Sequence, residues 1–351
     1  MNAALIISEA RELLVQLDAH AGGYAGLALL GLGAAVLIAS ALALGLLRLA
    51  AGVASSVRRS LSAAAIRRIT EHGARIVITR APGGRRRQMM SFVRAAIEEH
   101  LSSFMFGGPF RVLVFPGRVE NEAEAELVLK RTEADVVLWT ERAAGTRGVV
   151  RILSRLSNPT EKPRPAQSCV MPKSKTSWSS PLAQAIAYAA AKQFRPALGR
   201  PQDFRAERLQ PVVETLLKII SEKPAMDEVL LAELIEDAAA GSLQLALTGD
   251  SGWIERAVEI ARSTLADINR SDAPDRWINA KITLGRALRV RAEKRFDPVL
   301  LREAISHLTD ALDALRSEPR FKLAEAAAQA IGEAQKLLGA RRKFSISGGT
   351  I

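Results

Sequence analysis

A long apolar run near the N-terminus is the strongest pattern in the sequence. No charged residue occurs from Ala21 to Leu47, and the run reads AGGYAGLALLGLGAAVLIASALALGLL. A helix rises ~1.5 Å per residue, so ~20 apolar residues cross a hydrocarbon core ~30 Å thick. The pattern therefore predicts one transmembrane helix, with its flanking residues, over residues 21–50.

The charges beside this run predict its orientation. Before the run there is one basic residue, and after it come several: Arg11 precedes, and Arg48, Arg58, Arg59, Arg67 and Arg68 follow. Because an excess of Lys and Arg marks the cytoplasmic side, we expect the N-terminus outside and the C-terminus in the cytoplasm, across a cell inner membrane. A cleaved signal peptide is the alternative, but it needs a positively charged start and a shorter core of ~7–15 apolar residues.

The segments on either side of the span have their own patterns. Apolar residues at helical spacing predict a short N-terminal helix over residues 1–20, either at the outer interface or continuing the span. Residues 51–69 are a basic juxtamembrane segment whose arginines Arg58, Arg59, Arg67 and Arg68 suit an anionic lipid surface. Nucleic-acid binding is the other reading of a basic patch. The nearness of the membrane and the scarcity of aromatic residues favour lipid and no nucleic acid.

Small residues recur every four positions inside the span. They are Gly31, Ala35, Ala39 and Ala43. Such stripes let membrane helices approach closely, so a homodimer through this stripe is one interpretation, and chance in an Ala-rich helix is the other.

The hydrophobic period changes after the basic segment. β-branched runs at 75–79, 111–115, 134–140 and 148–156 predict strands, and helical patterns lie at 88–105 and 120–132. Strands alternating with helices predict βαβ units and a partly parallel sheet, and the short turn before residue 148 predicts a hairpin. We expect a small α/β domain of βαβαββ order over residues 70–195. Proline-rich residues 157–181 read as a loop, and 181–194 as a last helix that packs back on the sheet.

The loop after the first strand is the best candidate for a ligand site. It reads APGGRRRQ, so glycines and a helix start lie beside Arg85, Arg86 and Arg87. That chemistry suits a small anion such as a nucleotide. A glycine turn with surface arginines is the simpler interpretation, since neither phosphate-binding glycine motif is present.

From residue 205 onward the pattern is helical, with a repeated phrase. RWINAKITLGRAL (276–288) precedes LLREAISHLTDALDALRSEP (300–319). This pair resembles the tetratricopeptide repeat, which joins two helices with characteristic aromatic, Leu-Gly and small positions. The matching residues are Trp277, Leu284, Gly285, Leu288, Ala304, Leu308, Ala311 and Pro319. The resemblance implies that Gly285, Ala304 and Ala311 permit close helix packing.

Weaker copies flank this repeat at a constant offset. Ala257 precedes Ala304 by 47 residues, and Gly285 precedes Gly332 by 47. The family's usual repeat has ~34 residues, and we place the excess between the helices at residues 289–298. The resemblance covers residues 230–340 within a helical repeat domain expected over 205–340, whereas an irregular helical bundle is the alternative. Residues 341–351 are polar and read as a disordered tail.

Composition limits the chemistry. A lone cysteine, Cys169, excludes an internal disulfide, and the four histidines are scattered, so we expect neither a metal site nor a cofactor. Residues 1–199 carry 26 basic and 14 acidic residues, whereas residues 200–351 carry 23 of each. No catalytic constellation stands out, so we do not expect an enzyme.

The combined expectation is an α+β multi-domain protein with one transmembrane helix, a small α/β domain and an all-α repeat domain. Repeat solenoids present an extended surface to partner proteins, so the resemblance implies a scaffold that recruits a protein to the membrane. The alternative is a membrane-bound sensor whose α/β domain binds an anionic ligand at Arg85, Arg86 and Arg87 and signals through the helices.

Overall fold

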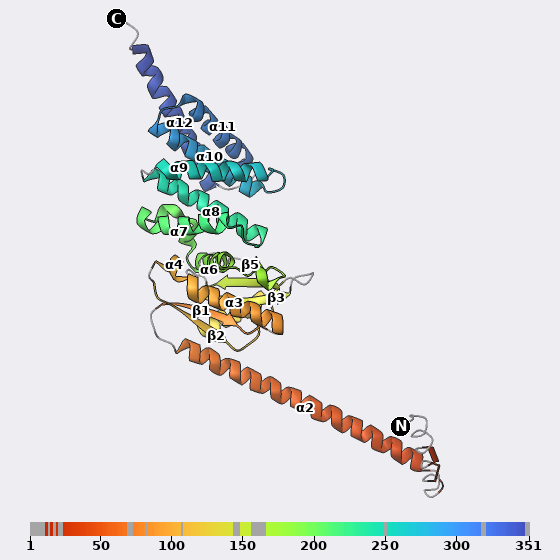
Figure 1. Cartoon of the computed structure of the whole chain (residues 1–351). Coiled ribbons are helices and arrows are strands. Elements are labelled where there is room, and N and C mark those ends of the chain that lie inside the picture. The colour runs from red at the N-terminus through yellow and green to blue at the C-terminus, as the bar shows by residue number, and fades with distance from the viewer. Residues whose placement is uncertain are drawn as a thin grey trace. The chain divides into compact units, whose positions relative to one another are not determined.

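The computed structural model divides the chain into two compact units, Met1–Ser62 and Ala63–Ile351. The residues that it describes are 11–12, 15–16, 19, 24–68, 73–81, 83–106, 108–142, 148–155, 166–248, 251–316 and 321–347. Helices dominate these residues, and the strands form one small mixed sheet (Figure 1).

The first unit contains most of helix α2 (Ala25–Arg67), which has 43 residues and whose last residues, from Ala63, belong to the second unit. Its part from Gly31 onward is long and apolar enough to cross a membrane. The basic segment expected over 51–69 is not a separate element, because α2 continues without a break to Arg67. Most of the helix expected over residues 1–20 lies outside the described residues.

The second unit begins with a five-stranded sheet. Its strands are β1 (Ala74–Thr79), β2 (Phe110–Phe115), β3 (Val136–Arg142), β4 (Gly148–Ser154) and β5 (Gln167–Val170). Their order is β2-β1-β3-β4-β5, with β1 parallel to β2 and β3, and β4 antiparallel to both neighbours. The partly parallel sheet and the β3–β4 hairpin are confirmed. The four-strand expectation is wrong, because β5 lies within the segment interpreted as a loop.

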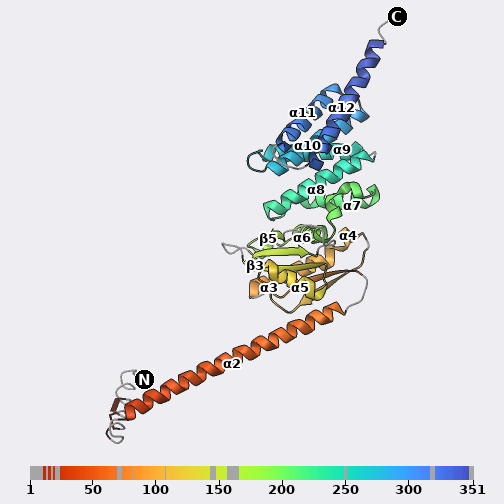
Figure 2. The ribbon, with the colours of Figure 1, turned by 180° about the vertical axis from the view of Figure 1, so that it is seen from behind.

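Helices cover both faces of this sheet. On one face lie α3 (Gly84–His100), α4 (Ser102–Met105) and α6 (Ser180–Phe194), packed on Ile76 and Ile78. On the other face α5 (Glu122–Thr132) packs with Val77 and with Ala63 and Ile66 from the end of α2. Alternate residues of β1 thus point to opposite faces, as strand geometry requires. Figure 1 shows α3 in front of the sheet, and Figure 2, seen from behind, shows α5 in front of it.

Local sequence explains where α5 begins and ends. The side chain of Asn121 accepts a hydrogen bond from the backbone N–H of Glu124, at 2.9 Å. Asparagine is a favoured helix cap, and the acids Glu122 and Glu124 in the first turn suit the positive end of the helix. The helix ends at Thr132, because the next residue, Glu133, has a left-handed backbone with a φ of 52°.

Six helices follow the sheet. They are α7 (Ala206–Ser221), α8 (Glu228–Leu247), α9 (Ser251–Asp267), α10 (Pro274–Lys294), α11 (Pro298–Leu315) and α12 (Phe321–Ser347). The helix starts repeat with the same offset as the sequence pattern: 47 residues separate Ser251 from Pro298, and 47 separate Pro274 from Phe321.

Two expectations about this region are corrected. Residues 289–294 continue α10, so most of the excess length is helix and not a connection between helices. Residues 341–347 continue α12, so most of the expected disordered tail is helical. Both segments, RVRAEK and RRKFSIS, are rich in charged residues, so their apolar periodicity is weak although the helix continues through them.

The six helices pack in sequence order. Each helix from α7 to α12 contacts the next, and α8 contacts α10, which contacts α12 (Figures 1 and 2). This pattern places α8, α10 and α12 side by side along one face, called here the inner-helix face. Packing of each helix on the next and on the next but one is the arrangement from which helical solenoids are built.

Candidate functional site

The close contact between α10 and α11 depends on a glycine. A Cβ atom added to Gly285 would lie 2.5 Å from Leu308 Cγ and 3.0 Å from the carbonyl oxygen of Ala304. Carbon atoms in contact are normally ~3.5–4.0 Å apart, so no larger residue fits here without movement. Gly285 therefore fixes the spacing of this helix pair.

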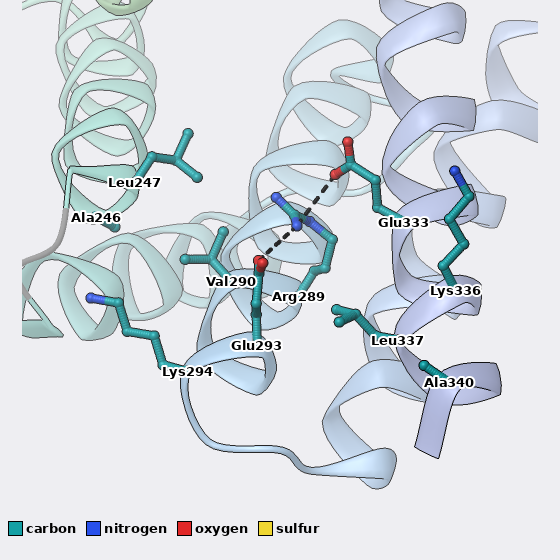
Figure 3. A pocket seen from close by; sticks show the side chains of 10 residues that line it. All are labelled: Ala246, Leu247, Arg289, Val290, Glu293, Lys294, Glu333, Lys336, Leu337 and Ala340. Carbon is teal, nitrogen blue, oxygen red and sulfur yellow. Dashed lines mark hydrogen bonds and ion pairs between the residues drawn. The ribbon is translucent and has the colours of Figure 1, made fainter. Parts of the chain in front are cut away.

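A pocket opens on the inner-helix face near the C-terminal ends of its helices. Its volume is about 790 Å³, and three helices supply its walls (Figure 3). The lining residues are Ala246 and Leu247 from α8, Arg289, Val290, Glu293 and Lys294 from α10, and Glu333, Lys336, Leu337 and Ala340 from α12. The walls thus combine aliphatic side chains with charges of both signs. None of these ten residues carries a hydroxyl, thiol or imidazole group, and the charged groups are those of two lysines, two glutamates and one arginine.

Arg289 holds the pocket together. Its Nη1 lies 3.0 Å from Glu293 on the same helix and 3.3 Å from Glu333 on α12, and its side chain is only 12% exposed. The dashed lines in Figure 3 mark these two ion pairs. One turn earlier, burial and the charge of Arg289 lower the pKa of Arg286. Two arginines therefore lie close together in a partly buried region, and Glu333 offsets part of their charge.

Comparisons with known proteins found no match. No family model matches the chain, and neither a curated protein nor a solved structure is similar to it. The tetratricopeptide-repeat resemblance consequently stays a prediction based on the residues themselves.

The structure brings together most residues of the predicted repeat. Leu284, Gly285 and Leu288 are buried on α10, and Ala304, Leu308 and Ala311 are buried on α11. Trp277 is half-buried, with Lys281 Nζ at 5.0 Å and Arg270 Cζ at 5.6 Å from its ring centre. Pro319 lies outside the described residues.

The predicted anion site lies at the start of α3. Gly83 precedes this helix with a φ of 80° and no side chain caps it. Arg85 donates a hydrogen bond to the backbone carbonyl of Lys173, Arg86 is half-buried, and Arg87 is exposed. Arg85 is therefore engaged in holding the loop after β5.

The predicted membrane-surface arginines fall on two units of the chain. Arg58 and Arg59 are exposed on α2 in the first unit. Arg67 ends α2 and Arg68 follows it, both exposed, in the second unit.

A buried polar network between α6 and α8 was not predicted. The carboxylate of Asp237 accepts hydrogen bonds from Tyr188 Oη at 2.9 Å and from Lys192 Nζ at 2.6 Å. Burial raises the pKa of Asp237, whereas Lys192 and Tyr188 oppose that shift. The three residues connect the last helix of the sheet domain to the helical array.

Neighbouring polar groups extend this network. Glu233 accepts a hydrogen bond from Gln167 Nε2 at 2.5 Å, and Glu236 accepts one from Asn279 Nδ2 at 3.3 Å. Burial raises the pKa of both carboxyl groups. Burial also raises the pKa of Cys169 to about 12, which makes this thiol inert. The sequence signal for this network is the spacing of Glu233, Glu236 and Asp237 at i, i+3 and i+4 within a mostly apolar stretch of α8.

Among the residues that the structure describes, no three His, Cys, Asp or Glu side chains are placed to hold a metal ion. The acids that do converge, on α8, are already engaged by Lys192, Tyr188, Gln167 and Asn279.

Proposed function

We propose that the chain is a non-catalytic, single-pass membrane protein that recruits a protein partner to the cytoplasmic surface of an inner membrane. Helix α2 is the anchor, with the N-terminus outside and the C-terminus in the cytoplasm. The helical array binds the partner in the pocket on the inner-helix face.

The pocket on the inner-helix face is the observation that carries the proposal. It is about 790 Å³ in volume, within the ~300–1,000 Å³ that binding sites usually occupy. Leu247 offers an exposed apolar surface, and Lys336 and Glu293 offer charges of both signs at the rim. Mixed walls of this kind suit a polypeptide segment, whose side chains provide both apolar area and charge.

Site-specific photocrosslinking in the full-length chain tests the binding surface. A photoreactive amino acid is placed at Leu247, Glu293 or Lys336 in the pocket, and for control at Arg302 or Thr309, exposed on α11. We expect one discrete adduct, identifiable by mass spectrometry as the same protein, from the pocket positions only. Equal labelling at pocket and control positions would refute the assignment of the binding surface.

Orientation and anchoring need a separate test. A reporter that is active only in the cytoplasm, fused after Ile351, should be active, and carbonate should leave the protein in the membrane pellet. Release by carbonate would refute the anchor, and an inactive reporter on a pelleted protein would refute the orientation.

A sensor function is the second proposal. The uncapped start of α3 beside Arg86 and Arg87 supports it, because unsatisfied N–H groups and cations attract anions. A nucleotide at 100 times its dissociation constant should raise the unfolding free energy by ~2.7 kcal/mol. A screen of ATP, GTP and cyclic dinucleotides that left the melting temperature unchanged would argue for the scaffold alone.

A further inference from the structure

One side of α2 stays apolar beyond the end of the uncharged run. Leu49, Val53, Val57 and Leu61 follow one another at intervals of four residues, and each side chain is between 52% and 68% exposed. At ~100° per residue, these four positions fall within ~120° of the helix circumference. They form a continuous stripe, called here the α2 seam.

Lipid cannot cover the far end of this seam. The uncharged run ends at Leu47, and at ~1.5 Å per residue Val57 and Leu61 lie ~15 Å and ~21 Å farther along the helix. The helix is unbroken to Arg67, so this part cannot turn to lie on the bilayer surface. Large aliphatic side chains exposed in a row outside the hydrocarbon core mark an interaction surface.

The charges indicate which partner fits. Arg48, Arg58 and Arg59 lie on the other side of α2, roughly 120–160° from the middle of the seam. A second copy inserted in the same orientation would meet the first seam-to-seam, with these three arginines of both copies turned outward. Arg67 and Arg68 fall on the seam side but lie beyond its last residue, Leu61, where Ala63 and Ile66 already pack in the second unit. Between Leu49 and Leu61 the aliphatic seam is thus self-complementary for a parallel pair.

The seam continues into the predicted span with suitable spacing. On the same side of the helix, four residues precede Leu49 at alternating intervals of four and three: Ala35, Ala39, Leu42 and Leu46. Alternating steps of three and four are the heptad spacing of left-handed helix pairs. Small residues at Ala35 and Ala39 allow close approach inside the bilayer, where lipid offers no hydrophobic driving force.

We propose that α2 is the seam of a parallel homodimer that runs from the span into the cytoplasmic part of the helix. This inference rests on the proposed membrane anchor and goes beyond it. The dimer presents two partner-binding arrays on one anchor, so a partner with two binding segments would bind more tightly than one array permits.

Cysteine crosslinking in native membranes tests the seam. The only natural cysteine, Cys169, is buried, so the background is low. In the full-length chain we compare Val53→Cys and Val57→Cys with Ala51→Cys, which is exposed on the opposite side of the helix at similar height. A disulfide requires Cα atoms ~4.4–6.8 Å apart. We expect mild oxidation to give at least tenfold more dimer from the two seam positions than from Ala51→Cys.

A second pair of variants changes packing without changing polarity. Ala39→Phe adds bulk to the seam, whereas Ala41→Phe adds the same bulk roughly 160° away, toward lipid. In the Val57→Cys background, Ala39→Phe should reduce the crosslinked dimer at least fivefold, and Ala41→Phe should not.

The outcomes separate the two proposals. Membrane-bound protein that crosslinks equally at all three positions, or at none, overturns the seam and leaves the anchor intact. Equal effects of Ala39→Phe and Ala41→Phe overturn it as well. Absence of the protein from the carbonate-washed membranes refutes the anchor on which the seam depends.

Discussion

Replacing Gly285 by alanine tests how closely α10 and α11 approach. The new Cβ would lie 2.5 Å from Leu308 Cγ and 3.0 Å from a backbone oxygen that cannot rotate away. Overpacking of this kind costs ~1–3 kcal/mol, and alanine returns ~1 kcal/mol because glycine is a poor helix former. The net effect of Gly285→Ala should be a loss of up to ~2 kcal/mol.

Gly332 provides a matched control. It follows Gly285 by 47 residues and lies in α12, but an added Cβ would meet no atom within 4 Å. Gly332→Ala should therefore stabilise its helix by up to ~1 kcal/mol. Between the two variants the local unfolding free energies should differ by ~1–3 kcal/mol, which is roughly a 5- to 150-fold difference in exchange protection at ~1.4 kcal/mol per tenfold.

Hydrogen exchange followed by mass spectrometry measures this difference in the full-length chain. Peptides from α10 and α11 should exchange faster in Gly285→Ala, and peptides from α12 more slowly in Gly332→Ala. A further check places Gly285→Ala in a Leu308→Ala background, where only the contact with the Ala304 carbonyl oxygen remains, so the alanine should destabilise less than it does beside Leu308. If Gly285→Ala slowed exchange as Gly332→Ala does, the close approach of the two helices would be wrong.

Three other perturbations follow from side-chain contacts. Asp297→Ala removes the acceptor for two backbone N–H groups at the start of α11, so it should lower the unfolding free energy by ~1 kcal/mol in a denaturation series. An unchanged unfolding free energy would contradict the role of Asp297 as a helix cap. Lys192→Met leaves Asp237 buried without its cation and should raise the pKa of Asp237 further. The pH range over which α6 and α8 lose stability as the pH rises should therefore move to higher pH, as measured by hydrogen exchange; an unchanged pH dependence would contradict the network. Burial lowers the pKa of His307, so the stability that neutral His307 contributes to the fold is complete above its unfolded pKa of ~6.5 and is lost as the pH falls through its lower folded pKa. His307→Gln should remove this loss of stability from the acid side of the pH profile, and an unchanged profile would contradict it.

The sequence predicted the elements that have a strong local pattern. Residues 75–79 and 111–115 alternate or run as β-branched residues, and they correspond to β1 and β2 within one residue. β5 was missed because its four residues, QSCV, lie between prolines and polar residues and pair only with β4. A strand this short is stabilised by its neighbour in space, which a local pattern does not reveal.

The candidate site depended still more on tertiary structure. The position of Gly285 against Leu308 agrees with the packing that the repeat resemblance implied, since both residues belonged to one recognisable phrase. One ion pair of Arg289 joins it to Glu333, 44 positions later, and no spacing rule connects these two residues. Tyr188 and Asp237 likewise meet across two helices whose separation in sequence gave no signal.

The pocket takes Glu333, Lys336, Leu337 and Ala340 from α12, the last helix of the described chain. Within the described residues α12 packs on α11 and α10 and no later helix packs on it, so we expect it to open at a lower free energy than helices packed on both sides. Fraying of α12 would therefore dismantle one wall of the binding surface while leaving α8 and α10 folded. A ligand that contacts all three helices would stabilise α12 as a further packed helix would. Ligand occupancy and the folded fraction of α12 should therefore increase and decrease together.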